Sequence, residues 1–253
     1  MTGQKFHELY DIMVRLRKEC PWDREQTHDS IKAATLEETH ELIETIDEKN
    51  FQEMKSELGD LLLHILFHSV IAEENKNFNI NDVIDSLKNK LIRRHPHVFG
   101  DVQVNGTEDV AKNWEEIKLS EGRNSVLEGV PKNLPSLARA YRLQEKASKV
   151  GFDWEKKEDV WKKVIEEIEE MHAMEKSGNK VELEKELGDV FFALTNYARF
   201  LGVNPENALR ITNEKFINRF SYIEQKIKEG GKTLKESNLE EMDKYWEESK
   251  KVL

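Results

Sequence analysis

One arrangement of carboxylates occurs twice in this chain, and it constrains the fold more than any other feature. Glu37, Glu38 and Glu41 are followed, after fifteen intervening residues, by Glu57 and Asp60. The same spacing recurs 129 residues later, from Glu166, Glu167 and Glu170 to Glu186 and Asp189. Residues three or four positions apart share one face of an α-helix. The sequence therefore predicts an all-α fold made of two tandem copies of one helical-bundle domain.

The rest of the sequence agrees with a helical fold. Charged residues make up 35% and apolar residues 38%, with only 12 Gly and 5 Pro, which favours helices over strands and turns. Apolar residues recur at helical spacing, and in the first half they predict helices over about 6–19, 29–48, 51–74, 81–95 and 107–119. In the second of these helices we expect Leu36, Ile43 and Ile46 to face inward, with Asp29 or Ser30 as the N-cap.

Domain boundaries follow from the repeat and from local composition. The stretch 121–135 is richer in Gly, Pro, Asn and Ser, which indicates a linker. We therefore predict an N-terminal domain over 1–120 and a C-terminal domain over 136–253. Pro21 should end the first helix near Cys20 and begin a short connection, because proline disfavours a helical residue before it.

A second repeated feature is cationic. Lys90 and Arg94 form an i, i+4 pair, and Lys215 and Arg219 repeat it at an offset of 125. The loss of four residues fits a shorter connection at Asn204 and Pro205, where Asn caps the next helix and Pro takes its first position. Beside a metal, such cations can bind phosphate oxygens, although salt bridges on an ordinary helix surface are the alternative. Two indoles also correspond: Trp114 and Trp246 could each stack on a base or pack in the core.

Charge and composition exclude several classes of protein. The formal net charge is −11, which argues against a general nucleic-acid surface but permits a nucleotide in one cleft. Cys20 is the single cysteine, so neither a disulfide framework nor a cysteine metal site is expected. No segment has the length and apolarity of a membrane span, and the N-terminus lacks an apolar signal core. We expect a cytoplasmic protein.

The repeated carboxylates indicate metal binding. Like charges brought so close repel unless a cation compensates, and oxygen-only ligands suit Mg²⁺, with Mn²⁺ as a second possibility. A solvated acidic face is the alternative for any single copy, but duplication at constant spacing favours a site. His64 and His68 share the stripe of Glu57 and Asp60, yet their counterparts are Ala193 and Tyr197. A di-iron carboxylate site is the remoter alternative, since Glu37 and His40 have the spacing of half of one.

These residues resemble the MazG family of nucleoside triphosphate pyrophosphohydrolases. The resemblance covers the whole chain and includes three further motifs: Cys20 to His28, Arg93 to Phe99, and Val150 to Trp154. It implies an all-α homodimer that depends on Mg²⁺ and hydrolyses nucleoside triphosphates, and by extension deoxynucleoside triphosphates, between the α and β phosphates. The competing class is a non-catalytic helical protein that binds metal or nucleotide and regulates a partner.

The resemblance also implies roles for individual residues. The metal ligands would be Glu167, Glu170, Glu186 and Asp189 in the second domain, and Glu38, Glu41, Glu57 and Asp60 in the first. Glu166, Glu167 and Glu170 are the candidates for orienting or deprotonating the attacking water. Substrate-binding positions would be Lys215, Arg219, Trp246, Lys90 and Arg94. The C-terminal domain is expected to be the main catalytic one.

Overall fold

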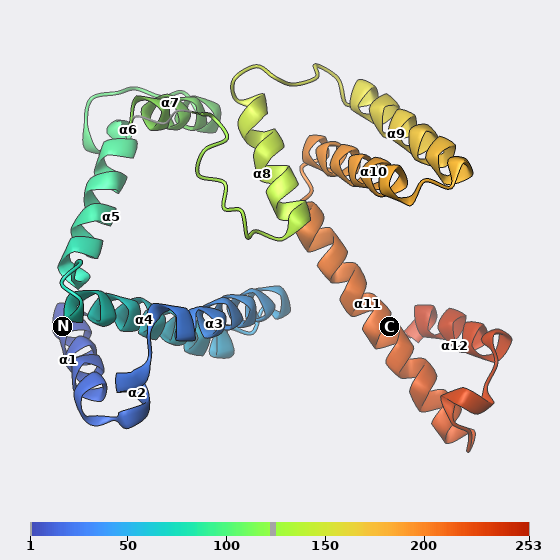
Figure 1. Cartoon of the computed structure of the whole chain (residues 1–253), viewed down its shortest axis with the longest axis horizontal. Helices are drawn as coiled ribbons and strands as arrows, with labels where there is room; N and C mark the ends of the chain where they lie inside the picture. The colour runs from blue at the N-terminus through green and yellow to red at the C-terminus, as the bar shows by residue number, and fades with distance from the viewer. Residues whose placement is uncertain (1, 122–124, 253) are drawn as a thin grey trace. The chain divides into compact units, whose positions relative to one another are not determined.

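The computed structural model describes residues 2–121 and 125–252, and within them every regular element is a helix (Figure 1). The chain divides into two compact units, Met1–Val110 and Ala111–Leu253. The all-α prediction is confirmed. The division falls inside one helix, ten residues before the predicted end of the first domain, so the boundaries 1–120 and 136–253 stay predictions. None of the described helices combines the length and apolarity needed to cross a membrane.

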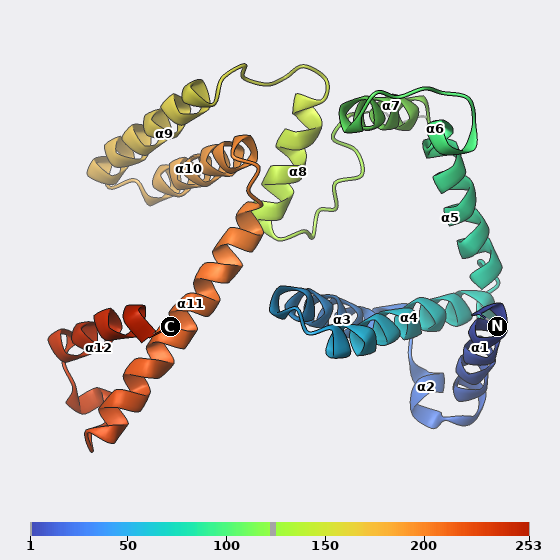
Figure 2. The ribbon, with the colours of Figure 1, turned by 180° about the vertical axis from the view of Figure 1, so that it is seen from behind.

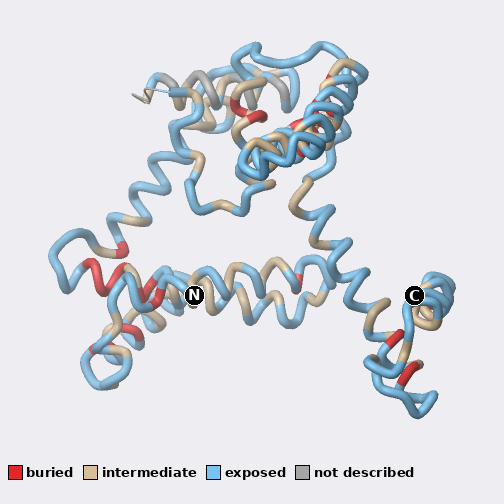
Figure 3. Tube along the Cα trace, turned by 45° about the vertical axis from the view of Figure 1, so that its right-hand side comes forward, coloured by how far each residue is buried: buried red, intermediate tan, exposed pale blue. Residues whose placement is uncertain are grey.

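The first unit is organised around a pair of long helices. These are α3 (His28–Glu48) and α4 (Phe51–Glu74), with α1 (Thr2–Glu19) packed on α4. Its core lies where these three helices and the start of α5 (Ile80–Arg94) meet, and it contains Met13, Ile31, Leu66, Phe67, Val70, Ile71 and Ile80. Buried positions concentrate there in Figure 3. The carboxylate-bearing halves of α3 and α4 lie beyond this core.

Two short helices in this unit were not predicted. Pro21–Glu25 forms α2 where we expected a connection, because Pro suits the first position of a helix as well as it ends the preceding one. Pro96–Phe99 forms α6 for the same reason. The predicted cap of α3 was wrong: Thr27, not Asp29 or Ser30, accepts from the backbone N–H of Ser30, and the Ser30 hydroxyl accepts from that of Thr27.

The second unit repeats the same arrangement. The pair is α9 (Lys157–Ser177) and α10 (Lys180–Phe200), and α8 (Ser136–Ser148) packs on α10 as α1 packs on α4. The two views in Figures 1 and 2 both show α9 and α10 side by side. Asn204 caps α11 (Pro205–Glu229) and Pro205 opens it, as predicted. The chain then passes through η1 (Leu234–Glu236) to α12 (Leu239–Val252), which packs on α11. The remaining helix is α7 (Thr107–Ser120).

Many apolar side chains on the long helices are exposed. Leu36 and Ile46, which we predicted to face inward, are 59% and 50% exposed, and Ile43 is only half-buried. The reason is that α3 packs chiefly on α4, so much of its remaining apolar surface is left uncovered by the described residues of the unit. The same is true of the second pair, where Trp161, Ile165, Leu187, Phe191 and Leu194 are exposed. Exposed apolar surface of this extent marks an interaction face.

Candidate metal and nucleotide site

The helix pair of each unit brings carboxylates from both of its helices together. In the first unit, side-chain oxygens of Glu38, Glu41 and Glu57 lie within 4.8 Å of one another. In the second unit, Glu167, Glu186 and Asp189 do the same. These separations allow one small cation to contact all three oxygens of a group, and an oxygen-only ligand set suits a hard divalent ion. The described residues therefore fit a hard divalent cation in both units.

Electrostatics identify the fourth carboxylate of each cluster. Loss of hydration, followed by repulsion from Glu170 and Asp189, raises the pKa of Glu186. Likewise, loss of hydration and then repulsion from Glu41 and Asp60 raise the pKa of Glu57. Glu170 and Asp60, which are not members of the closest groups, therefore contribute charge to them. Such mutual repulsion is what a bound cation would relieve.

Glu38, which lies on α3, is subject to the same repulsion between carboxylates. Its pKa is raised first by loss of hydration and then by the charges of Glu41, Asp60 and Glu37. Glu37 thus lies beside the first cluster without belonging to its closest group. All the carboxylates predicted as ligands consequently lie in or beside one of the two clusters, although their role as ligands stays a prediction.

In the second unit a lysine binds the carboxylates that the sequence analysis made candidates for catalysis. Lys163 Nζ lies 2.7 Å from Glu167 Oε1 and 2.8 Å from Glu166 Oε1. These hydrogen bonds raise the pKa of Lys163 above its ordinary value, so it stays a cation. The counterpart of Lys163 in the first unit is Ala34. This contact of Lys163 was not predicted, although the i, i+4 spacing of Lys163 and Glu167 indicates it.

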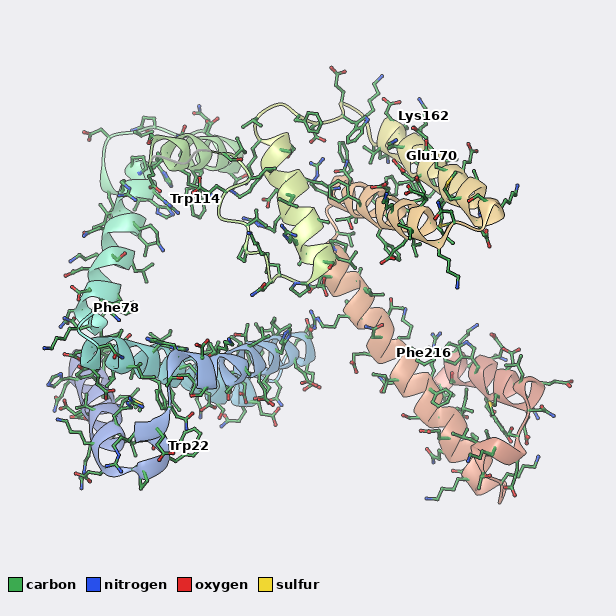
Figure 4. The ribbon with its side chains drawn as sticks, viewed as in Figure 1. Trp22, Phe78, Trp114, Lys162, Glu170 and Phe216 are labelled. Atoms are coloured by element: carbon green, nitrogen blue, oxygen red, sulfur yellow. The ribbon has the colours of Figure 1, made fainter. Side chains whose placement is uncertain are left out.

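The predicted phosphate-binding cations lie elsewhere in the second unit. Figure 4 shows Phe216, the neighbour of Lys215 on α11, well away from Glu170 on α9. Arg219 instead packs over the ring of Trp246, with its guanidinium carbon 5.4 Å from the ring centroid. The Nε atom of Arg219 is buried without a hydrogen-bond partner. Within this unit, the cation that contacts the carboxylates is therefore Lys163, whereas Arg219 packs on Trp246.

The corresponding residues of the first half are arranged on other elements. Lys90 and Arg94 lie on α5, which follows the carboxylate-bearing α4. Trp114 lies on α7, where the ammonium of Lys118 is 4.9 Å from its ring centroid. The roles proposed for these three residues remain predictions.

Fold and clusters together define a class: all-helical proteins that carry clustered carboxylates for a divalent cation on a pair of antiparallel helices. Comparison with known proteins narrows this class. The model of the MazG nucleotide pyrophosphohydrolase domain matches residues 26–99 and again residues 155–223. Both matches contain a complete set of the repeated carboxylates. The chain belongs to the MazG family.

Individual relatives match nearly the whole chain. It is 46% identical over 254 residues to the nucleoside triphosphate pyrophosphohydrolase/pyrophosphatase MazG of Thermotoga maritima, covering 98% of this chain and 97% of that protein. It is 40% identical over 252 residues to the nucleoside triphosphate pyrophosphohydrolase of Escherichia coli K12, with 96% of each chain covered. An uncharacterized Bacillus subtilis protein, YabN, is 49% identical over 254 residues, which is 52% of its length.

Proposed function

We propose that this protein hydrolyses nucleoside triphosphates, and deoxynucleoside triphosphates, to the monophosphate and pyrophosphate. The observation that carries the proposal is the pair of carboxylate clusters, each inside a segment matched by the family's domain. The names of the two relatives that match nearly the full chain support the same reaction. Cleavage between the α and β phosphates rests on the family, since clustered carboxylates alone would also suit cleavage between β and γ.

The metal is proposed to be Mg²⁺, with Mn²⁺ as a substitute. Glu167, Glu170, Glu186 and Asp189 would hold it in the second unit, and Glu38, Glu41, Glu57 and Asp60 in the first. When bound, the ion supplies neutralisation of phosphate charge and acidification of water. Both are required for attack on an anionic triphosphate.

The chain's own residues supply the remaining steps. Glu166 shares the ammonium of Lys163 with Glu167, so we assign it, with Glu167 and Glu170, to orienting the attacking water and accepting its proton. A cation held by Glu167 would compete with Lys163 for that carboxylate and would weaken their ion pair. The ammonium of Lys163 is then free to bind a phosphate oxygen of the substrate.

The separation of cations from carboxylates supports a homodimer. Phe216, the neighbour of Lys215 on α11, lies well away from Glu170 on α9 (Figure 4). A second copy that packs on the exposed apolar faces of α9 and α10 would bring its α11 to this site. Phe216 and Ile217 on α11 are also apolar and exposed. We therefore assign Lys215, Arg219 and Trp246 to the nucleotide held by the partner's carboxylates.

Product analysis tests the proposed reaction. The full-length protein is incubated with each nucleoside triphosphate and Mg²⁺, and the products are separated by anion-exchange chromatography. The expected products are monophosphate and pyrophosphate, with no turnover after chelation and recovery on adding Mg²⁺ or Mn²⁺. Diphosphate with orthophosphate would refute the assigned bond. Nucleotide binding without turnover at any metal concentration would instead establish the non-catalytic alternative.

A further inference from the structure

Three histidines and a threonine form a hydrogen-bonded network beside the first carboxylate cluster. Thr35 Oγ1, on α3, lies 2.8 Å from His64 Nδ1 and 3.2 Å from His68 Nε2, both on α4. The Nδ1 atom of His68 lies in turn 2.8 Å from Nδ1 of His28, at the start of α3. The side chain of His64 is only 11% exposed. The network therefore holds the His64 ring in a defined orientation, largely removed from solvent.

The hydrogen bonds of Thr35 determine which nitrogen of His64 carries a hydrogen. The Thr35 hydroxyl donates its one hydrogen to the carbonyl of Ile31 at 3.0 Å. Its oxygen can then only accept, so His64 donates from Nδ1 and His68 donates from Nε2. Loss of hydration lowers the pKa of His64, which favours the neutral ring. A neutral ring with its hydrogen on Nδ1 has a lone pair on Nε2.

The Nε2 atom of His64 lies on the side of the ring that adjoins the carboxylates. It is 4.0 Å from Glu38 Oε1, which is too long for a hydrogen bond. Asp60 precedes His64 by one turn on α4, and its charge acts on the same ring. An ionised carboxylate and an imidazole nitrogen with a lone pair both only accept hydrogen bonds. A metal ion placed between them would satisfy both.

The separation of His64 Nε2 from Glu38 Oε1 is close to that of two ligands on one ion. Zinc binds imidazole nitrogen and carboxylate oxygen at about 2.0–2.2 Å, so two such atoms on a tetrahedral ion lie about 3.4 Å apart. The observed 4.0 Å is longer, and rotation about the side-chain bonds of Glu38 can make up the difference. Glu38 already groups with Glu41 and Glu57 within 4.8 Å. One imidazole and three carboxylates together make a set of four ligands.

The second unit replaces every member of this network. At the offset of 129 that relates the carboxylates, the counterparts of His28, Thr35, His64 and His68 are Lys157, Val164, Ala193 and Tyr197. Val164 and Ala193 are buried, and the ring of Tyr197 packs on Trp161 with their centroids 4.9 Å apart. The repeat therefore supplies carboxylates to both units, but at this position it supplies an imidazole only to the first.

We propose that His64 is a metal ligand in the first unit, beside the carboxylates of the first cluster, and that this site prefers Zn²⁺ to Mg²⁺. Imidazole is a good ligand for zinc, whereas Mg²⁺ is bound by oxygen ligands. Thr35 is a positioning residue, because it accepts from the other ring nitrogen and so directs Nε2 toward the ion. The inference rests on the metal site proposed for the first unit, and it gives the two copies different metal preferences.

Nitrogen NMR of the full-length protein with isotope-labelled histidine tests the ligand directly. The signals of His64 are assigned by their absence from His64→Gln. Without metal, Nδ1 of His64 should carry the hydrogen and Nε2 should not, and Zn²⁺ should then shift the Nε2 signal. His40, an exposed histidine on α3, is the internal control and should not respond at the same zinc concentration. A hydrogen on Nε2 before zinc is added, no shift with zinc, or an equal response of His40 overturns the proposal.

Calorimetric titration of the same protein compares the two metals. His64→Gln keeps an amide that can donate to Thr35 and removes the imidazole nitrogen. It should weaken Zn²⁺ binding at one site by about tenfold or more, while Mg²⁺ affinity stays nearly the same, since oxygen ligands dominate magnesium binding. His40→Gln is the matched control and should alter neither affinity. A parallel loss of both ions in His64→Gln would show that the ring only supports the cluster structurally, which overturns the proposal.

The positioning role of Thr35 is tested by its counterpart in the second unit. Thr35→Val reproduces Val164 and should lower Zn²⁺ affinity by about tenfold, whereas Thr35→Ser keeps the hydroxyl and should restore it. Equal affinities in all three proteins overturn that role. None of these measurements needs a nucleotide, so they do not depend on the proposed hydrolysis. If the first cluster bound no divalent ion, its proposed metal site would fail as well, whereas Mg²⁺ binding without any response of His64 overturns this inference alone.

Discussion

The two units of this chain carry the same carboxylates in different surroundings. Each cluster joins three carboxylates from two adjacent helices, and neither has lost an acidic position. Beside the second cluster lie Lys163 and an open apolar cavity. Beside the first, Ala34 replaces the lysine and Met13, Arg17 and Phe67 are packed into the core. The difference teaches that the carboxylates alone do not distinguish the two copies, because the positions beside them differ in charge and in packing.

A histidine network adjoins the first cluster, whereas Ala193 and Tyr197 stand at the positions of His64 and His68 in the second unit. The Nδ1 atoms of His28 and His68 are 2.8 Å apart, and the hydroxyl of Thr35 lies 2.8 Å from His64 Nδ1. Burial lowers the pKa of both His64 and His68, which favours their neutral forms. His64 Nε2 is 4.0 Å from Glu38 Oε1. The first copy therefore uses this space for a network of its own side chains.

Removing one carboxylate charge from each cluster in turn should produce the largest difference in activity between the two units. Glu170→Gln should lower kcat/KM by more than about 100-fold, because it removes a charge from the metal-binding set of the unit that has the cavity. Glu41→Gln makes the same change in the first unit and should have a smaller effect. Steady-state kinetics at saturating Mg²⁺ measure both. The reverse ranking would assign catalysis to the first unit.

Arg17 allows a test of the packing that distinguishes the first unit from the second. It donates to both oxygens of Glu74 and to the carbonyls of Asp23 and Gln26 from a buried position. Arg17→Ala should destabilise the first unit by about 2 kcal/mol, because these acceptors lose a charged donor. Hydrogen exchange of α1 and α4 amides measures the loss, and kcat should remain unchanged. Arg15→Ala, which removes only an exposed pair with Glu19, is the control and should change exchange little.

The repeat in the sequence predicted the paired helices and both carboxylate clusters. It did not predict which apolar and polar side chains would be buried, for a physical reason. Helical periodicity located the long helices, and carboxylate spacing located both clusters. The inward-facing assignment of Leu36 and Ile46 was wrong because periodicity identifies an apolar stripe without saying what covers it. The burial of the polar residues Gln144 and Asn196 was not predicted, because a polar residue in an apolar stripe has no distinctive spacing. Comparing Asn196 with Phe67 across the repeat would have identified that position.

Lys163 is a charged residue beside the second cluster that the first unit lacks at the corresponding position. Lys163→Ala reproduces Ala34 of the first unit and should raise KM for nucleoside triphosphates about tenfold, as one charged contact to phosphate is lost. The same variant should bind Mg²⁺ more tightly in the absence of nucleotide, because Glu167 no longer has a competing cation. Calorimetric titration with Mg²⁺ measures the second effect. If both affinities fell together, Lys163 would be supporting the site structurally and its assignment to phosphate would be wrong.

The smallest expected effect concerns how the two helix pairs begin. Thr27 caps α3 through a reciprocal pair of hydrogen bonds with Ser30, whereas its counterpart Lys156 begins α9 with no side-chain cap. An N-cap contributes about 1 kcal/mol, so Thr27→Ala should weaken the first turn of α3 by that amount. Lys156→Thr should strengthen the first turn of α9 by up to as much. Hydrogen exchange of the first-turn amides reports each change. The next turns of α9 carry Lys163 and Glu167. If the site is already formed without substrate, Lys156→Thr should leave kcat unchanged. A rise in kcat would show that the start of α9 must fold before substrate binds.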